Sequence, residues 1–165
     1  LTMSKIAKAI SAAAGESEGG IQAMLDDAAM AVMVLNGGSA VPLWNTWLDG
    51  LQEEAPEGNE IDTAGIQAIF AKALKALSDM SGAKVGDKTM MDALIPASQA
   101  IAAYSGSDEA GLFDAAAQAA LQGAEASKQF VSKFGRAKSY GEQTIGTPDA
   151  GAASMAYFFQ GLARP

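Results

Sequence analysis

The chain has 165 residues and a formal net charge of -8, so a nucleic-acid-binding surface is not expected. It contains neither cysteine nor histidine, which excludes disulfides, thiol or imidazole catalysis, and metal sites built from those side chains. Any metal must be held by oxygen ligands, as Mg²⁺ or Ca²⁺ is. The longest strongly apolar run, about residues 28–35, is far shorter than the ~20 residues of a membrane span. No signal peptide leads the chain, so we expect a cytoplasmic protein.

Apolar residues recur at three-to-four spacing over almost the whole chain, which is typical of amphipathic helices. No stretch convincingly indicates a strand. Glycine-rich breaks separate the helices, and alanine-rich faces favour an antiparallel bundle. We therefore predict one all-α domain over residues 1–165, with helices at Thr2–Ala14, Ile21–Leu35, Leu43–Leu51, Asp62–Met80, Thr89–Tyr104, Glu109–Phe134 and Asp149–Leu162.

The break between the second and third predicted helices reads LNGGSAVPLW, residues 35–44. One interpretation is helix punctuation alone, with the glycine pair ending one helix and Pro42 near the start of the next. The other is an anion site. Gly37, Gly38 and Ser39 leave backbone N–H groups unobstructed at a helix N-terminus, where the helix dipole favours phosphate. The residues alone leave both interpretations open.

The stretch GAKVGDKTMMDAL, residues 82–94, looks at first like a phosphate-binding loop. It does not fit a Walker A loop, which has four residues between its glycines and joins a strand to a helix. An aspartate also stands between Gly86 and Lys88. The simpler interpretation is a turn glycine followed by Asp87, which caps a helix beginning near Lys88. Taken alone, the residues favour this cap over a nucleotide loop.

The longest break, residues 135–148, has no apolar period, and long loops in compact domains tend to be functional. Helix capping explains Thr147 as an N-cap, Pro148 as the first helical residue and Asp149 as an acidic residue in the first turn. Capping does not explain Arg136, which stands alone between glycine-flanked turns and is suited to binding phosphate oxygens.

Together and in this order, these stretches resemble the ADP-binding domain of the dihydroxyacetone kinase family. GGSAVPLW resembles its GGxSGPLxG segment, GDKTMMDALIPA resembles GDKTMxDxxxP, and GRAKSYGEQTIGTPDAGAAS resembles GRAxYxGExxxGxxDPGAxS. The family includes the ADP-binding subunit of phosphotransferase-system dihydroxyacetone kinases and the C-terminal domain of ATP-dependent ones. The resemblance implies a barrel of eight antiparallel amphipathic helices with a nucleotide at one end. The first of those helices has no counterpart in this chain.

The same resemblance implies which residues bind the nucleotide. Arg136 would approach the diphosphate and is the candidate catalytic residue. The other cofactor-binding candidates are Gly38, Ser39 and Ala40 at the phosphates, Gly82 and Met90 at the adenine, Thr89 near the phosphates or supporting its loop, and Asp149, Ala150 and Gly151 along the remaining edge.

The chain departs from the family pattern in several places. Ala40 and Val41 replace a serine and a glycine of the phosphate loop, and the proline of the DPG segment stands at position 148. The family's GDxDxG segment, whose aspartates hold Mg²⁺, is missing, so no metal ligand is assigned within the chain. Because Leu1–Ser4 resembles the residues that follow that segment, and the chain opens without methionine, we expect the Mg²⁺ ligands in an upstream piece.

The resemblance implies a kinase module that binds ADP or ATP with Mg²⁺ and transfers a phosphoryl group to a small ketose such as dihydroxyacetone. A partner domain or subunit would hold the ketose, so activity would require that partner and the upstream piece. A phosphohistidine-carrying phosphotransferase subunit is a second candidate partner, and a homodimer is also left open. The alternative is a non-catalytic helical barrel, regulatory or lipid-binding, that has lost the metal site. The phosphate donor and the ketose stay open.

Overall fold

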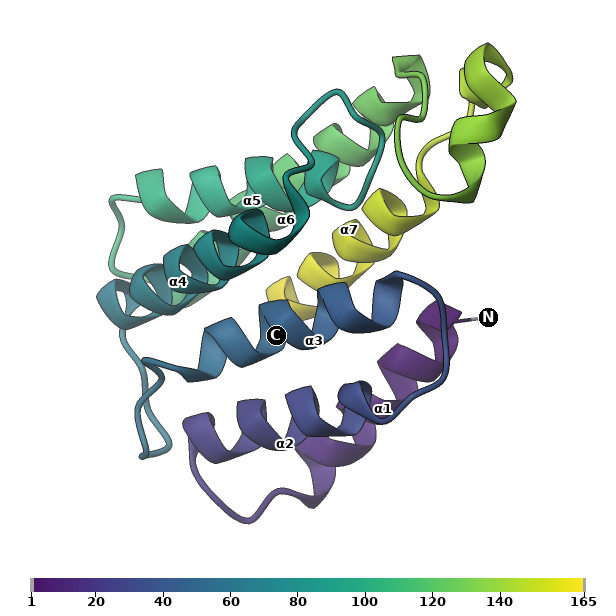
Figure 1. The fold of residues 1–165 in the computed structure, drawn as a ribbon. Coiled ribbons are helices and arrows are strands. Elements are labelled where there is room, and N and C mark those ends of the chain that lie inside the picture. The colour runs from purple at the N-terminus through teal and green to yellow at the C-terminus, as the bar shows by residue number, and fades with distance from the viewer. Residues whose placement is uncertain (1, 165) are drawn as a thin grey trace. The chain divides into compact units, whose positions relative to one another are not determined.

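A computed structural model describes residues 2–164, and every regular element within them is a helix (Figure 1). The prediction of an all-α protein is confirmed in this part of the chain. Leu1, which begins the predicted Leu1–Ser4 match, and Pro165 lie outside the described residues. The chain divides into two compact units, unit 1 up to Ser81 and unit 2 from Gly82 onward. The single domain and the eight-helix barrel stay predictions.

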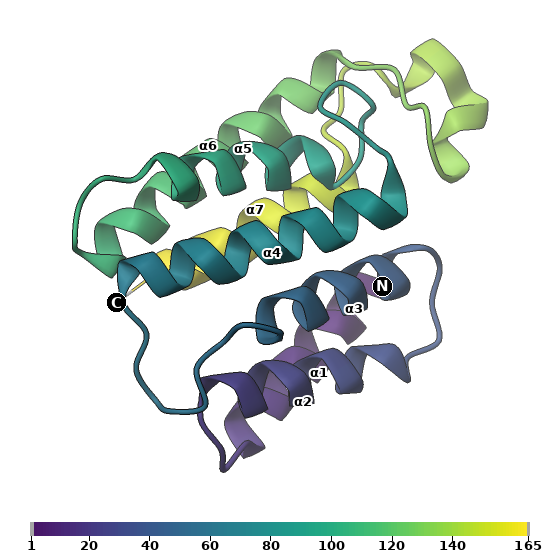
Figure 2. The ribbon, with the colours of Figure 1, turned by 60° about the vertical axis from the view of Figure 1, so that its left-hand side comes forward.

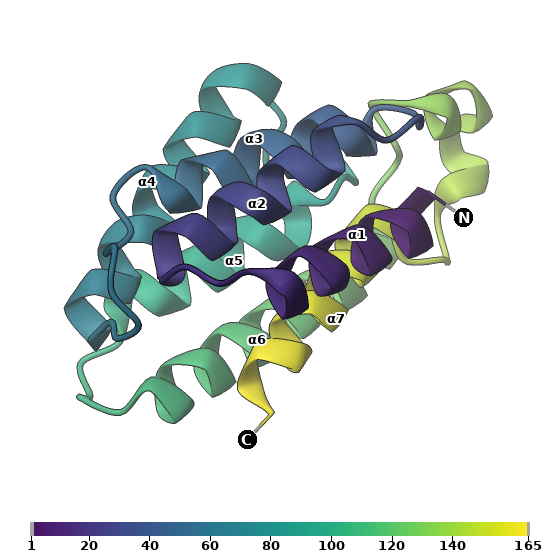
Figure 3. The same ribbon diagram turned by 90° about the horizontal axis from the view of Figure 1, so that it is seen from below.

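Unit 1 consists of four helices, each packed against the next: α1 (Thr2–Glu16), α2 (Ile21–Met33), α3 (Ala40–Gln52) and α4 (Thr63–Ser81). Neighbours run in opposite directions, as Figure 3 shows for α1 and α2. In the core, Trp44 and Trp47 of α3 meet edge to face with 5.6 Å between ring centroids. α3 begins at Ala40, before the predicted Leu43. Pro42 therefore lies in the first turn, where its missing N–H costs no helical hydrogen bond.

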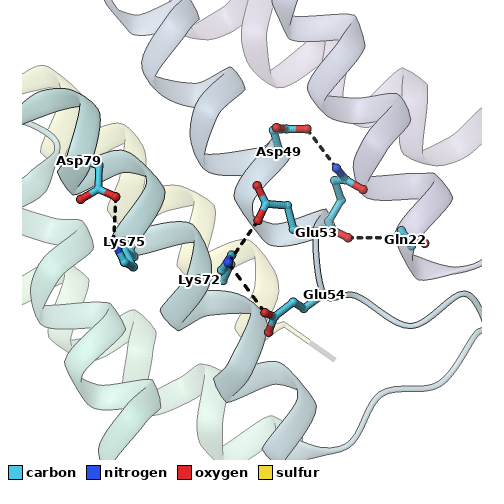
Figure 4. A network of polar contacts seen from close by, with 8 residues as sticks. Gln22, Asp49, Glu53, Glu54, Lys72, Lys75 and Asp79 are labelled. Carbon is cyan, nitrogen blue, oxygen red and sulfur yellow. Dashed lines mark hydrogen bonds and ion pairs between the residues drawn. The ribbon is translucent and has the colours of Figure 1, made fainter.

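Polar side chains, exposed or partly buried, connect the helices of unit 1 near its surface. The Lys72 ammonium on α4 lies 3.5 Å from a carboxylate oxygen of Glu53 and 3.9 Å from one of Glu54 (Figure 4). The Gln22 side-chain amide on α2 donates to the Gln52 carbonyl at 3.0 Å. Ion pairs that are exposed to this degree typically contribute about 0–1 kcal/mol. The apolar core, and not this network, therefore stabilises unit 1.

Unit 2 packs α5 (Met91–Ala103), α6 (Glu109–Ala126) and α7 (Ala150–Ala163) against one another. α5 and α7 run in one direction and α6 in the other (Figure 2). The N-termini of α5 and α7 and the C-terminus of α6 consequently lie at the same end. Two loops occupy this end, residues 82–90 before α5 and residues 127–149 between α6 and α7 (Figures 1 and 2). We call it the loop end of unit 2.

The predicted helix Glu109–Phe134 is too long. α6 ends at Ala126, and the short 3₁₀ segments η1 (Ser127–Gln129) and η2 (Arg136–Thr144) follow. The Ser127 hydroxyl donates to the Ala124 carbonyl at 2.6 Å and accepts from the Asp149 amide at 2.8 Å, so tertiary contacts end the helix. The remaining predicted helices are confirmed, with ends that differ by three residues or fewer. Within residues 2–164, no helix combines the length and apolarity needed to span a membrane.

Candidate functional site

The predicted site residues fall in both units. Gly38, Ser39 and Ala40 belong to unit 1, and the others belong to unit 2. Ser39 precedes α3 as its N-cap residue but makes no side-chain hydrogen bond to the helix. The first turn of α3 thus has no side-chain cap on its N–H groups, an arrangement that suits an anion. A Cβ on Gly38 would meet nothing within 4 Å, so this exposed glycine leaves open space at the helix start.

Val41, which stands where the family has a glycine, is buried in unit 1. Its methyl group takes up space beside Gly37, because a Cβ at position 37 would lie 2.9 Å from Val41 Cγ2 and 2.8 Å from Thr2 Cγ2. Gly37 therefore accommodates the larger side chain at position 41. Val41 and Thr2 of α1 therefore both lie beside Gly37, and Gly38 stays exposed.

Asp92, in the first turn of α5, organises the loop before that helix. Its carboxylate is fully buried and accepts hydrogen bonds from the amides of Gly86 and Thr89, both at 2.7 Å. The Thr89 hydroxyl accepts from the Met91 amide at 3.1 Å. The Met91 amide is one of those that a helix start leaves without a partner, whereas the Gly86 and Thr89 amides belong to the loop before α5. Of the two roles predicted for Thr89, its contacts match the support of the loop.

The predicted cap by Asp87 is wrong. α5 begins at Met91, and Lys88 has a φ of 62°, which is incompatible with a helix starting there. Asp87 instead closes the loop, accepting from the Lys84 amide at 2.9 Å and pairing with the Lys133 ammonium at 3.2 Å. The Lys84 amide, followed by Lys133, lowers the pKa of the Asp87 carboxyl below its ordinary value.

Asp149 is the N-cap of α7, where its carboxylate accepts from the Ala152 amide at 2.9 Å. The prediction of Thr147 as the cap is therefore wrong, and Pro148 precedes the cap instead of starting the helix. The local sequence allowed both positions, but Asp149 is the one with extended backbone immediately before the helix. Ala150 is the first residue of α7 and is exposed.

Burial raises the pKa of the Asp149 carboxyl, and the nearby Asp92 charge adds to that effect. Hydrogen bonds from the Ala152 and Gly151 amides and the positive charge of Lys88 act in the opposite direction. The carboxyl thus lies in a partly desolvated setting, close to two other charged side chains. Perturbed carboxyls of this kind are common at binding sites, although structural networks produce them too.

The structure brings several predicted residues of unit 2 together. A Cβ on Gly151 would lie 3.3 Å from both the Cβ and the amide nitrogen of Met90, and 3.1 Å from an Asp149 carboxylate oxygen. The start of α7 therefore lies directly against the start of α5. Gly82 begins the loop before α5 and Arg136 begins η2, so both belong to the loop end but lie outside this cluster of contacts.

Arg136 is exposed and follows Gly135, whose φ of 66° turns the chain into η2. In residues 2–164 no acidic side chain forms an ion pair with its guanidinium. The segment 127–149 that carries it has four basic and two acidic residues, a net charge of +2, in a chain of net charge -8. A positive segment beside two helix N-termini favours an anionic ligand.

Lys88 is a residue that sequence reasoning missed. The residue is 5% exposed, and its ammonium donates to the carbonyl of Ser127 at 3.0 Å and to those of Thr144 and Thr147. Lys88 thereby joins the loop before α5 to three points of the segment 127–149. The available signal was the GDKTMxDxxxP pattern, which contains both Lys88 and Asp92.

The acidic side chains of the described residues form no large cluster. Within residues 2–164, no group of three or more acidic side chains is arranged to hold a metal ion. Mg²⁺ prefers near-octahedral oxygen coordination with one or two carboxylates.

Comparisons with known proteins support the resemblance. The sequence profile of the DAK2 domain matches residues 1–164. The chain is 36% identical over 148 residues to the D-erythrulose kinase of Mycolicibacterium smegmatis, covering 88% of this chain and 26% of that protein. It is 27% identical over 135 residues to the ADP-binding subunit of PEP-dependent dihydroxyacetone kinase 2 of Listeria innocua, covering 81% and 62% respectively.

The crystal structure of the dihydroxyacetone kinase of C. freundii matches the fold with a TM-score of 0.62 and 26% identity, over 86% of this chain and 23% of that one. The chain thus spans about a quarter of the length of the erythrulose kinase that it matches. Because the family profile covers nearly all of the sequence, the resemblance carried by the three loop segments is confirmed, and the chain belongs to the DAK2 domain family.

Proposed function

We propose that this chain is the nucleotide-binding module of a ketose kinase, which binds ADP or ATP and presents it to a small ketose held by another domain or subunit. The observation that carries the proposal is the loop end of unit 2. There the N-termini of α5 and α7 coincide with a positively charged segment and with the exposed Arg136. Family membership supports the same function, because the named relatives are ketose kinases and an ADP-binding kinase subunit.

The proposed phosphoryl transfer needs little covalent chemistry from the protein. Phosphoryl transfer requires that the phosphates be held in line and that their charge be neutralised. We propose that Arg136 binds the diphosphate, which its planar guanidinium can contact through two N–H groups at once. The amides of Gly38 and Ser39, before α3, are proposed as further phosphate donors, with Ala40 beside them.

We propose that the base and sugar lie along the remaining residues of the site. Gly82 and Met90 would border the adenine, and Asp149, Ala150 and Gly151 would form the far edge of the nucleotide. The missing side chain of Gly151 supports this, because it lets α7 approach the backbone of Met90 closely. Thr89 contributes by fixing the loop through its bond to the Met91 amide.

The remaining partners are proposals from the family. The family resemblance supports Mg²⁺ as a companion of the nucleotide, with ligands in the upstream piece that the resemblance implies. The ketose would be bound by a separate kinase subunit or domain. In a phosphotransferase system, a phosphohistidine-carrying phosphotransferase subunit would replace ATP as the phosphate donor. A homodimer and a cytoplasmic location are further proposals. The non-catalytic barrel is the weaker candidate, because the relatives above are named as kinases or kinase subunits.

Isothermal titration of ADP with Mg²⁺ into the natural full-length protein tests the proposal. Arg136→Ala should weaken ADP binding by about 10-fold to 100-fold, the loss expected for charge-assisted hydrogen bonds. Arg164→Ala is a matched control, since it removes the same charge from the exposed C-cap of α7 and should leave affinity within about twofold. No binding heat from a folded protein would overturn the proposed function.

A further inference from the structure

We propose that Lys88 is a positioning residue whose buried ammonium holds the segment 127–149 in the arrangement that nucleotide binding by Arg136 and Asp149 requires. The nucleotide part of this inference rests on the proposed function. The structural part, that one cation fastens the segment, stands on the contacts alone.

The donors of Lys88 match the acceptors around it. A lysine ammonium has three N–H donors and no acceptor. Here its contacts are the carbonyl oxygens of Ser127, Thr144 and Thr147. These carbonyls lie at the end of α6, at the end of η2 and two residues before the cap of α7. A single ammonium thus joins three places on a segment whose regular structure is limited to the 3₁₀ segments η1 and η2.

The electrostatics of the contact favour a charged group at this position. Ser127 is the C-cap residue of α6, so its carbonyl lies at the negative end of the helix dipole. A buried ammonium is costly unless hydrogen bonds compensate for its lost hydration, and the three carbonyls provide that compensation. A neutral side chain of the same length would leave all three carbonyls without this donor.

The backbone of Lys88 supports a role for its side chain. Among residues 2–164, Lys88 is the non-glycine residue with a positive φ, 62°. The left-handed region is unfavourable for a residue with a Cβ, and glycine would adopt it without strain. The fold therefore accepts a strained position at which it keeps a lysine, and the ammonium contacts explain what this residue gains over glycine.

Three backbone amides report whether the segment is held in place. The Gly146 amide donates to the Lys128 carbonyl at 2.7 Å, the Ser132 amide to the Thr144 hydroxyl at 3.0 Å, and the Asp149 amide to the Ser127 hydroxyl at 2.8 Å. Each of these bonds has a partner at or beside a carbonyl that Lys88 binds. Loss of the ammonium should therefore expose these amides to solvent exchange while the helix cores stay closed.

Hydrogen exchange on the full-length protein tests the structural part. In Lys88→Met, exchange at these three amides should accelerate roughly tenfold or more, with no change in the core of α6. Lys84→Met is the matched control, because Lys84 is an exposed lysine of the same loop, and it should leave the rates unchanged. Unchanged exchange at all three amides in folded Lys88→Met would overturn the inference.

Chemical rescue distinguishes the ammonium from the rest of the side chain. Lys88→Ala removes a group equivalent to n-propylammonium, so adding that ion should restore slow exchange, whereas tetramethylammonium, which has no N–H donor, should not. If Lys88→Met does not fold, recovery of folded Lys88→Ala in n-propylammonium supports the inference. Failure of that ion to restore either folding or slow exchange contradicts it.

ADP titration completes the test. Lys88→Met should bind ADP roughly tenfold more weakly than the wild-type protein, and n-propylammonium should restore affinity to Lys88→Ala. Faster exchange with ADP affinity within about twofold of wild type would overturn the positioning role. If the wild-type protein binds no ADP, the proposed function and the nucleotide part of this inference both fail, and the exchange rates still decide whether Lys88 fastens the segment.

Discussion

The two units of the chain differ in where they keep their polar groups. Unit 1 buries mainly apolar residues and has exposed ion pairs, whereas the polar residues that are buried as a whole in the described part of the chain all belong to unit 2. Left-handed backbone follows the same division, at Lys88 and at the glycines 82, 86, 135, 141 and 146. Buried polar groups and strained backbone reduce stability unless specific contacts compensate. Their concentration in unit 2, mostly at its loop end, matches the nucleotide site that we propose there.

The largest expected effect compares a buried carboxylate with an exposed one. Asp92 of unit 2 accepts from two amides at 2.7 Å while fully buried, and Asp62 of unit 1 accepts from the exposed Gly65 amide at 2.7 Å. Asp92→Ala should lower the free energy of unfolding by about 3 kcal/mol, because it leaves two partly buried N–H groups without their acceptor and empties a buried position. Asp62→Ala should cost only about 1 kcal/mol, the usual loss of a helix cap.

Urea denaturation of both variants measures these losses. Asp92→Asn is the control for shape, since it keeps an oxygen acceptor and should fall between wild type and Asp92→Ala. Equal losses for Asp92→Ala and Asp62→Ala would remove the distinction between a buried loop carboxylate and an ordinary surface cap.

The second effect concerns close helix packing, which both units use. A Cβ on Gly123 would lie 2.0 Å from the Asp92 carbonyl oxygen between α5 and α6, and one on Gly50 would lie 2.8 Å from Ala73 Cα between α3 and α4. Gly123→Ala should therefore destabilise by about 2 kcal/mol or more, and Gly50→Ala by about 1 kcal/mol, as overpacking does. Gly161 of α7 has open space around it, so Gly161→Ala should stabilise by about 0.5 kcal/mol.

Thermal unfolding of these three glycine variants gives the ranking. If Gly123→Ala proves as harmless as Gly161→Ala, the helices α5 and α6 do not approach as closely as the structure has them.

The smallest effect separates two aspartates of unit 2 by the sign of their pH dependence. The pKa of Asp149 is raised above the ordinary value of 3.8 by burial, so the folded protein binds this proton more tightly than the unfolded chain. That contribution to stability is present below pH 3.8 and is lost as the pH rises through the folded pKa. Asp149→Asn keeps an oxygen for the cap but does not titrate. Its stability relative to wild type should therefore increase as the pH rises from 3.8 through the folded pKa of Asp149.

Asp87 should show the opposite trend. Its pKa is lowered by the Lys84 amide and by Lys133, so its contribution is present above the ordinary value of 3.8 and is lost as the pH falls through the folded pKa. Asp87→Asn should thus lose stability relative to wild type as the pH rises into that range. Urea denaturation at a series of pH values measures both differences, and trends of the same sign for the two variants would contradict the assigned environments.

Helix positions could be predicted from the sequence where local periodicity controls the structure. Amphipathic spacing located the helices because each buries one face, and the loop motifs located the candidate site through their resemblance to a family. The end of α6 could not be predicted in this way. Residues 127–134 continue an acceptable helical pattern, and the contacts that end the helix at Ser127 come from Lys88 and Asp149, far away in the chain.

The capping errors have the same origin. Gly-Asp-Lys-Thr and Thr-Pro-Asp each offer more than one residue that could cap a helix. Local sequence favoured Asp87 and Thr147, but the loop before α5 is held by Asp92 from inside the helix. The role of Lys88 depends on three main-chain carbonyls. Because every residue has such a carbonyl, the identities of the residues do not indicate which ones Lys88 contacts.

The tryptophan pair of α3 makes the division of the chain accessible to optical measurement. Both tryptophans, Trp44 and Trp47, lie in unit 1, whereas the three tyrosines lie in unit 2, at positions 104, 140 and 157. Fluorescence excited at a wavelength that only tryptophan absorbs therefore reports on unit 1. Both indole rings are buried there and would become exposed to water on unfolding. The natural sequence carries its own fluorescent label for one unit, so the loss of structure in unit 1 can be followed without any substitution.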